Sequence, residues 1–217
     1  MPPSPFRRTR IKFCGFTDVA DLHAAVELGV DAIGLVCVPG SRRELSPTAA
    51  AALRRQVPPL VSVVLLLSNA PDDVAARAIA AIRPDLLQFH GQESAEACSR
   101  HGLAYIKAVS VRTADDIFRA SAAHAGTAAL LLDSHDAGGL GGTGHSFDWA
   151  QIPANVGHRL ILAGGLNPDN VGRAVRMSTP YAVDVSSGIE SAPGRKDPAR
   201  MQAFVEAVCR ADTAAKP

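Results

Sequence analysis

Eight short runs of apolar residues, separated by alanine-rich amphipathic segments, constrain the fold of this 217-residue chain more than any other feature. The runs are rich in Val, Ile and Leu and mostly do not alternate with polar residues. That pattern indicates strands covered on both faces, as in a parallel sheet. The predicted strands are 11–14, 32–38, 61–67, 86–89, 104–109, 128–132, 159–163 and 182–185. The predicted helices are 18–28, 47–55, 72–82, 94–100, 113–120, 168–177 and 198–210.

This order of elements predicts an α/β fold, a single-domain (β/α)8 TIM barrel over residues 10–210. An open, doubly wound sheet is the alternative, but it normally carries its glycine fingerprint after the first strand, and here the fuller glycine motifs come late. Thr17 is the expected N-cap of the first helix. We expect residues 1–9 to be a frayed or disordered N-terminal tail and residues 211–217 to be a loose C-terminal tail.

Composition and charge exclude several classes of partner. Lys and Arg number 22 and Asp and Glu 21, a formal net charge of +1, so we expect no nucleic-acid partner and no membrane partner. The longest apolar run, 60–67, is too short to span a bilayer, and segment 1–10 lacks the apolar centre of a signal peptide. The four cysteines form no C-x-x-C pair, which predicts reduced thiols in a cytoplasmic protein without a metal site. These cysteines are Cys14, Cys37, Cys98 and Cys209.

In such a barrel the carboxyl ends of the strands face the active site, and that rule selects a small set of polar side chains. Asp133 follows three leucines, and partial withdrawal from water raises the pKa of a carboxyl group, which suits a general acid. The alternative is a carboxylate that caps the following turn. Cys14, which ends the first strand, can be a nucleophile, a general base or an inert buried residue. The other polar residues at these ends are Cys37, Arg42, Arg43, Gln88, His90, Lys107 and Asp184.

Two residues of that set have both a functional and an ordinary interpretation. Arg43 can clamp a carboxylate or phosphate in bidentate fashion, or it can be a solvated loop arginine. His90, next to Gly91, can contact substrate, or it can be a histidine whose hydrogen bonds are satisfied within the protein.

Small-residue turns after the seventh and eighth strands indicate a phosphate site. Gly164-Gly165 and Ser186-Ser187-Gly188 each precede a predicted helix start. Backbone N–H groups are free at a helix N-terminus, where the dipole favours an anion. The loops after strands 7 and 8 also form the usual phosphate site of these barrels. We therefore expect a small phosphorylated molecule as the substrate.

The connection after the sixth strand, 134–153, is expected to be mainly loop. Its segment 138–144, which contains Gly141 and Gly142, is too glycine-rich for a static helix. We expect it to close over a bound substrate, with a loose surface loop as the alternative. It lacks the Lys-Ser/Thr ending of a Walker motif, so nucleotide binding is not expected.

An ordered set of motifs covers residues from about 10 to 210. The motifs are Lys12-Phe13-Cys14-Gly15, Ser41-Arg42-Arg43-Glu44-Leu45-Ser46-Pro47, Gln88-Phe89-His90-Gly91, Leu131-Leu132-Asp133, Gly141-Gly142-Thr143-Gly144, Phe147-Asp148-Trp149, Ala163-Gly164-Gly165-Leu166-Asn167-Pro168, Asp184-Val185-Ser186-Ser187-Gly188-Ile189-Glu190 and Pro193-Gly194-Arg195-Lys196-Asp197. Each motif alone is weak, but the set in this order resembles the phosphoribosylanthranilate isomerase family of tryptophan biosynthesis.

The resemblance implies an Amadori rearrangement, which converts N-(5-phosphoribosyl)anthranilate to 1-(2-carboxyphenylamino)-1-deoxyribulose 5-phosphate without a metal or organic cofactor. It implies that Asp133 protonates the furanose ring oxygen and that Cys14 removes the proton from C2. Arg43 is the implied contact for the anthranilate carboxylate. Further implied ligands are Gln88, His90 and Asp184 for the substrate, and Gly164, Gly165, Ser186, Ser187 and Gly188 for its phosphate. The expected oligomeric state is a monomer or a homodimer.

Two alternative functions differ in what they require of the site. A related isomerase of histidine synthesis performs the same rearrangement on a related barrel, but its family carries an aspartate in the role of Cys14; a dual-specificity enzyme is a variant of this alternative. A non-catalytic sugar-phosphate-binding barrel would not need an intact Cys14 and Asp133. The departures from the family are mild: Phe13 and Phe89 replace smaller aliphatic residues, and 37–40 lacks the aromatic residues often found there.

Overall fold

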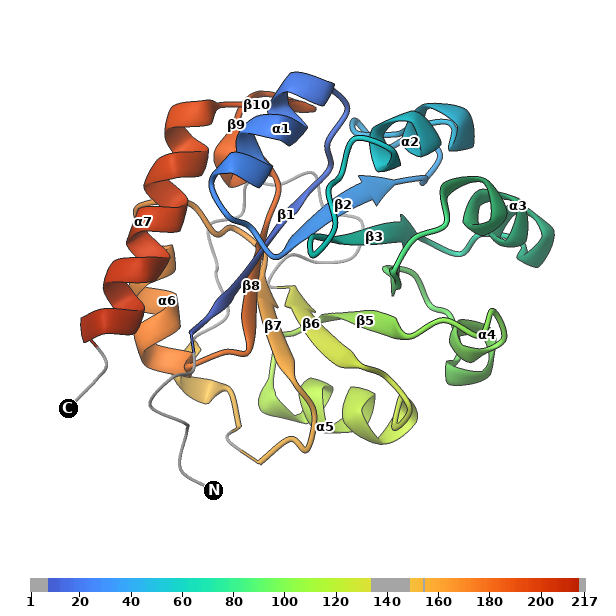
Figure 1. Ribbon diagram of the computed structural model, residues 1–217. Coiled ribbons are helices and arrows are strands. Elements are labelled where there is room, and N and C mark those ends of the chain that lie inside the picture. Colours follow the sequence, from blue (N-terminus) through green and yellow to red (C-terminus); the bar gives the residue numbers. More distant parts are fainter. Residues whose placement is uncertain (1–7, 134–148, 154, 215–217) are drawn as a thin grey trace.

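The chain folds into a closed barrel of eight parallel strands, in which each strand pairs with the next and β8 pairs with β1 (Figure 1). The computed structural model describes residues 8–133, 149–153 and 155–214. The predicted (β/α)8 architecture is therefore confirmed. The strands are β1 (Arg10–Cys14), β2 (Ala32–Val36), β3 (Ser62–Leu67), β4 (Leu86–Phe89), β5 (Tyr105–Ser110), β6 (Ala129–Asp133), β7 (Leu160–Ala163) and β8 (Ala182–Val185).

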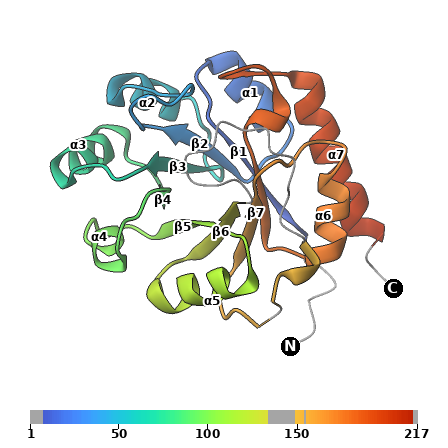
Figure 2. The same ribbon diagram turned by 180° about the vertical axis from the view of Figure 1, so that it is seen from behind.

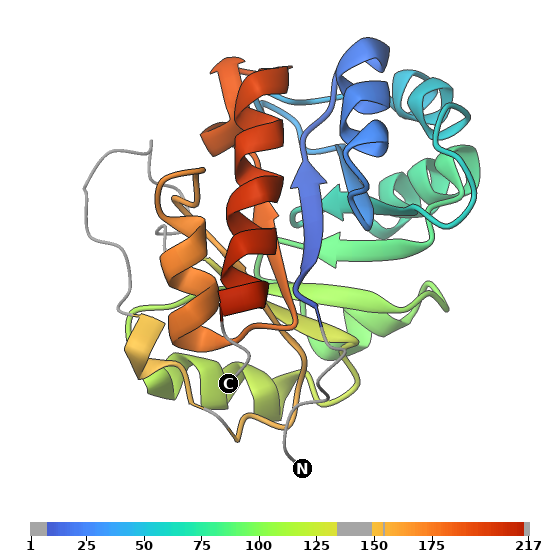
Figure 3. The same ribbon diagram turned by 60° about the vertical axis from the view of Figure 1, so that its left-hand side comes forward.

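Helices form an outer layer around this barrel (Figure 2), and α6 and α7 lie side by side next to β8 (Figure 3). The α-helices are α1 (Val19–Glu27), α2 (Pro47–Arg54), α3 (Asp72–Ile82), α4 (Ala95–Ser99), α5 (Ala114–Ala123), α6 (Val171–Ser178) and α7 (Pro198–Ala214). Short 3-10 helices occur at η1 (Trp149–Gln151) and η2 (Ser187–Ile189). No helix in the described part of the chain has the length and apolar character needed to cross a membrane.

A small antiparallel pair, β9 (Glu190–Ala192) and β10 (Arg195–Lys196), follows η2 and precedes α7. Strands this short carry no periodic pattern, so the sequence does not predict them. The turn between them accepts a hydrogen bond from the loop before α1, because Thr17 Oγ1 donates to the Gly194 carbonyl at 2.6 Å. The N-cap of α1 is therefore Asp18 and not Thr17: the Asp18 carboxylate accepts from two backbone N–H groups of the first turn.

The strands bury both faces, but the two faces have different contents. Side chains on the outer face pack against the helices, as the Phe13 ring does against Phe204 with centroids 5.8 Å apart. The inner face is apolar over most of its length, and it becomes polar only toward the carboxyl ends of the strands. The apolar interior includes Val64, Ile106, Leu131 and Ile161, and the polar positions include Lys12, Gln88 and Asp184.

The two ends of the described chain meet at the amino-terminal side of the barrel. Thr9 is buried, and both its N–H and its Oγ1 donate to Asp212, each at 2.7 Å. Arg8 forms a bidentate pair with Asp31. The last helix consequently extends to Ala214 and does not end at residue 210, and residues 8 and 9 are held by contacts instead of belonging to a frayed tail. Residues 1–7 and 215–217 lie outside the described residues.

We predict that Asp212→Ala lowers the free energy of unfolding by about 1–3 kcal/mol, because a part-buried N–H and hydroxyl both lose a charged acceptor. Urea unfolding followed by circular dichroism would measure the change. Thr213→Ala is the matched control. The exposed Thr213 hydroxyl donates only to carbonyls of its own helix, so its removal should change the free energy of unfolding by no more than about 0.5 kcal/mol. Equal stability of the Asp212 variant and the wild type would contradict this role.

Candidate active site

A cavity of about 620 Å³ opens at the carboxyl ends of the strands and gathers most of the predicted site residues. Its lining includes Cys14, Arg43, Gln88, His90, Asp133, Gly164, Gly165, Asp184, Ser186 and Ser187. Gly188 does not line it: a Cβ there would overlap the Leu166 carbonyl oxygen, so this glycine lets the turn after β8 pack on the turn after β7. Gly141 and Gly142 lie outside the described residues.

A wider hollow of about 1000 Å³ lies at the other end of the barrel. Arg10 and Arg159 place their guanidinium groups over the Tyr181 ring there, 4.3 and 5.4 Å from its centroid. None of the predicted acid, base or phosphate-binding residues lines this hollow. The candidate active site is therefore the smaller cavity, at the end of the barrel where parallel strands of this fold carry their chemistry.

Asp133 ends β6 at the edge of the cavity, beside a histidine that follows β4. His90 Nε2 lies 3.3 Å from Asp133 Oδ2, and the Asp133 side chain is 18% exposed. Asp133 therefore presents its carboxyl group to the cavity. A partner at this distance restricts the rotation of that carboxyl group, so His90 helps to orient it. The sequence left this contact unforeseen because the two residues lie on different strands.

Cys14 ends β1 on the inner face of the barrel and is buried. Burial raises the pKa of its thiol and the Asp184 carboxylate adds to that effect, while the ammonium groups of Lys12 and Lys196 lower the pKa without reversing the shift. Space for the sulfur is provided by the neighbouring strand, because a Cβ on Gly34 would lie 2.5 Å from Cys14 Sγ. Glycine at this position of β2 allows the thiol to occupy its place in the cavity wall.

Asp184 is held by a lysine that the sequence did not select as a site residue. Lys12 Nζ lies 2.8 Å from Asp184 Oδ1, and both side chains are almost fully buried. Lys12 also lies opposite Asp184 in the β1–β8 register. One local signal pointed to it: residues two apart on a strand share a face, so Lys12 faces the same way as Cys14.

Arg43, in the loop after β2, is engaged by a buried carboxylate. Its Nε and Nη2 donate to the two carboxylate oxygens of Glu190 at 2.7 and 2.6 Å, in the fork geometry that suits this pair. The hydrogen bond to Glu190 raises the pKa of Arg43. Arg43 still lines the cavity, and it keeps further N–H groups beyond the two that Glu190 accepts. Arg43 is thus not a solvated loop arginine, and part of its guanidinium group is already paired with Glu190.

Lys196, from β10, connects the Arg43–Glu190 pair to the backbone at the floor of the cavity. Its Nζ donates to Glu190 Oε1 at 2.9 Å, to the Cys14 carbonyl at 2.7 Å and to the Ser186 carbonyl at 3.2 Å. Burial opposes ionisation of Glu190, but the bonds from Arg43 and Lys196 outweigh it and lower the pKa of the carboxyl group. The sequence did not single out Glu190 and Lys196 as site residues, although both lie in the late motifs 184–190 and 193–197.

The two turns predicted to bind phosphate lie side by side above β7 and β8. Gly164 and Gly165 have φ of 76° and 65°, a backbone conformation that favours glycine. Ser186 Oγ donates to the Cys14 carbonyl at 2.9 Å, so that hydroxyl ties the turn after β8 to β1. Both turns border the cavity. The helix α6 begins shortly after the first turn, whereas the second turn itself enters the short η2, and β9 and β10 separate it from α7.

Gln88, on the inner face of β4, is a buried polar side chain of the cavity wall with spare hydrogen-bonding capacity. It is 1% exposed, and neither its Nε2 nor its Oε1 has a hydrogen-bond partner in the described part of the chain. Buried amides are normally paired, so an orphaned one on a cavity wall points to a ligand. Gln88 therefore has a donor and an acceptor available for a bound molecule.

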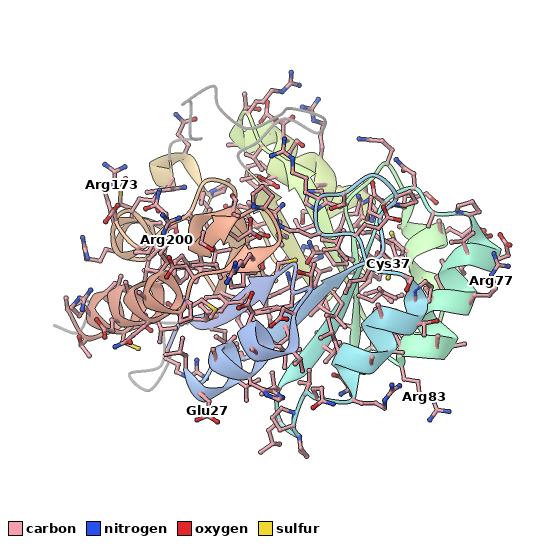
Figure 4. The ribbon with its side chains drawn as sticks, turned by 90° about the horizontal axis from the view of Figure 1, so that it is seen from above. Glu27, Cys37, Arg77, Arg83, Arg173 and Arg200 are labelled. Atoms are coloured by element: carbon pink, nitrogen blue, oxygen red, sulfur yellow. The ribbon has the colours of Figure 1, made fainter. Side chains whose placement is uncertain are left out.

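Charge elsewhere on the molecule is arranged differently. Glu27, Arg77 and Arg83 on or beside the outer helices point away from the body of the protein (Figure 4). The charged groups around Cys14, in contrast, are packed inside it. Within the described residues, no group of three or more His, Cys, Asp or Glu side chains is arranged to hold a metal ion.

Fold and site together define a (β/α)8 barrel with a carboxyl group, a thiol and two small-residue turns around one cavity. The family model described as N-(5'phosphoribosyl)anthranilate (PRA) isomerase matches residues 11–207. An N-(5'-phosphoribosyl)anthranilate isomerase of Nitrosococcus oceani is 47% identical over 201 residues, covering 93% of this chain and 98% of its own. One from Pseudomonas aeruginosa is 49% identical over 199 residues, covering 92% and 94%. The chain belongs to the N-(5'-phosphoribosyl)anthranilate isomerase family.

Solved structures agree with this assignment. The crystal structure of phosphoribosyl anthranilate isomerase from Thermotoga maritima superposes with a TM-score of 0.86 at 36% identity, covering 93% of this chain and 99% of its own. A crystal structure of such an isomerase in complex with reduced 1-(o-carboxyphenylamino)-1-deoxyribulose 5-phosphate gives a TM-score of 0.80 at 32% identity, with the same coverage.

We predict that Gly34→Ala lowers kcat for the family's reaction about 10- to 100-fold, because the added methyl group displaces the Cys14 sulfur and misplaced reactive groups lose rate steeply. Steady-state kinetics on the purified variant would measure this. Gly126→Ala, where a Cβ meets no atom within 4 Å, is the matched control and should keep wild-type kcat. Full turnover by a folded Gly34→Ala variant would refute the requirement for space.

Proposed function

We propose that this chain catalyses the Amadori rearrangement of N-(5-phosphoribosyl)anthranilate to 1-(2-carboxyphenylamino)-1-deoxyribulose 5-phosphate. The observation that carries the proposal is that Asp133 and Cys14 line one cavity in a member of this isomerase family. Asp133 protonates the furanose ring oxygen, and the ring opens to a Schiff base. Cys14 then removes the C2 proton, and the resulting enolamine tautomerises to the ketone. Opening of the ring breaks its C1–O bond as the substrate nitrogen forms the C=N bond, and the protein supplies only proton transfers, so the proposal includes no metal or organic cofactor.

The order of strands around the barrel supports this division of roles. Asp133 ends β6 and Cys14 ends β1, and the turns after β7 and β8 lie between them. A sugar phosphate held by those turns extends over the barrel mouth between the acid and the base. The phosphate accepts hydrogen bonds from the backbone around Gly164, Gly165, Ser186, Ser187 and Gly188, with Gly188 contributing through the packing of one turn on the other.

Other residues of the cavity bind the anthranilate and sugar parts of the substrate. Arg43 binds the anthranilate carboxylate with the N–H groups that Glu190 leaves unused. Gln88 binds a sugar hydroxyl, which gives its buried amide the partner it lacks within the described protein. His90 orients Asp133. Asp184 contacts the substrate from the cavity wall beside Cys14. We infer that the protein works as a monomer or a homodimer in the cytoplasm.

Turnover of both aminoaldose substrates, that of tryptophan synthesis and that of histidine synthesis, tests the function. We expect wild-type protein to turn over only the anthranilate compound. Asp133→Asn should lower kcat about 10²–10⁴-fold and still bind the product, because the amide keeps the shape but cannot donate the proton. Product affinity by calorimetry controls for folding. Near wild-type kcat in Asp133→Asn would exclude Asp133 as the acid, and turnover of the histidine-pathway substrate would establish dual specificity.

A second prediction separates a base from a nucleophile at Cys14. An Amadori rearrangement removes a proton and needs no covalent adduct, so both Cys14→Ala and Cys14→Ser should lose most turnover. Alkylation of Cys14 should inactivate the enzyme, and product should protect it. Mass spectrometry of enzyme trapped during turnover should find no adduct on Cys14. The exposed Cys209, replaced by serine, serves as the control with unchanged kcat. A substrate adduct on Cys14, or a fully active Cys14→Ala enzyme, would overturn this role.

A further inference from the structure

Lys12 is a buried charge to which neither the family resemblance nor the predicted site assigned a role. Its side chain is 5% exposed, and it stands two residues before Cys14 on the same face of β1. A buried ammonium group needs a partner, and Asp184 supplies one at 2.8 Å. A neutral residue would close the barrel without burying two charges. The buried charge of Lys12 is therefore better explained by a role in the site than by a role in the fold.

We propose that Lys12, held by Asp184, is the positioning residue that lets Cys14 carry negative charge as the base. This inference rests on the proposed role of Cys14. Lys12 does not touch the reacting carbon in this scheme and acts through the sulfur. The proton-transfer step breaks the C2–H bond and forms an S–H bond. The electron pair forms the C1–C2 double bond of the enolamine, and the Schiff-base nitrogen takes the former C–N π pair.

Lys12 itself is not the base, because it stays protonated. Burial alone would lower its pKa, but Asp184 and Cys14 outweigh burial and raise it. A group that keeps its proton cannot accept one from C2. It can, however, stabilise an adjacent anion, and charge and hydrogen bonding from Lys12 both lower the pKa of the Cys14 thiol. Without that ammonium group, burial would act on the thiol with less opposition.

The charges around the sulfur support an anion there. The described groups that act on Cys14 are Lys12 from β1, Asp184 from β8, Lys196 from β10 and Arg43 from the loop after β2. Glu190 pairs with both Lys196 and Arg43. Three cations and two carboxylates leave a net charge of +1, which a thiolate at Cys14 neutralises. Lys196 donates to backbone carbonyls and to Glu190, so Lys12 is the cation available to the sulfur.

The alkylation rate of Cys14 by iodoacetamide tests the proposal without substrate. The rate is followed on the Cys14 peptide by mass spectrometry over a range of pH, which separates it from the other cysteines. We expect Lys12→Met to slow alkylation at mildly alkaline pH about tenfold or more, and to move the profile to higher pH by about 1–3 pH units. Lys107→Met is the matched control: Lys107 is a buried lysine on β5 that pairs with Glu93 and does not line the cavity, so this variant should keep the wild-type profile.

A double variant that replaces both members of the ion pair with neutral residues tests whether Lys12 affects Cys14 directly or only through the stability of the fold. Lys12→Met with Asp184→Asn removes both charges, so no unpaired carboxylate is buried and the net charge is unchanged. We expect the double variant to melt cooperatively and to alkylate Cys14 more slowly than wild type but faster than Lys12→Met, because loss of the Asp184 carboxylate offsets only part of the loss of the ammonium group. A wild-type alkylation profile in the double variant, or in a folded Lys12→Met protein, would overturn the proposal.

Kinetics separate this proposal from the proposed function. Lys12→Met should lower kcat about tenfold or more and leave KM within about threefold, with part of the loss recovered as the pH rises. A purely structural role would instead change KM and melting temperature together and leave the pH profile of kcat unmoved, which would count against the proposal. If Cys14→Ala keeps full turnover, the proposed role of Cys14 as the base fails, while the alkylation result still reports whether Lys12 stabilises the thiolate.

Discussion

The pairing of the first strand with the last is the constraint on which both the barrel and its chemistry depend. In the β1–β8 register Lys12 lies opposite Asp184, and the same two residues form an ion pair inside the barrel. The strand pairing that closes the sheet thus also sets a cation beside the proposed base. A closed barrel has no free edge, so the carboxyl ends of all its strands meet around one cavity. Residues as distant in the chain as Cys14 and Ser187 line it for that reason.

Burying charge at that cavity is a cost that stability alone does not explain. Removing an ion from water costs several kcal/mol even after relaxation, and a buried pair is often no better than an apolar pair of the same size. Most helix charges of this protein avoid the cost by pointing into solvent (Figure 4). The pairs Lys12–Asp184 and Lys196–Glu190 do not. Fixed charges inside a cavity stabilise developing charge without having to reorganise, which is the property a proton-transfer site requires.

The sequence predicts the barrel because its signal is local: each strand is a continuous apolar run buried on both faces. It also predicts Cys14 and Asp133, because both stand where such a run ends. It does not predict the partners of those residues. Arg43 and Glu190 lie 147 positions apart, and no local pattern links them. The contact of His90 with Asp133 has the same origin, since it joins the ends of two strands that are not neighbours. Only Lys12 carried a local signal, its spacing from Cys14.

The late motif that contains Lys196 shows how such long-range partners can serve one site without lining it. In the proposed complex the substrate carries a carboxylate at one end, held by Arg43, and a phosphate at the other, held by the turns after β7 and β8. Lys196 bonds to Glu190, the partner of Arg43, to the Ser186 carbonyl in the second turn, and to the carbonyl of Cys14. In that complex a single buried ammonium group therefore ties both proposed anion sites to the proposed base. Because the C2 proton lies between the two anionic ends of the substrate, the distance from that proton to the sulfur is set by the same contacts that recognise those ends.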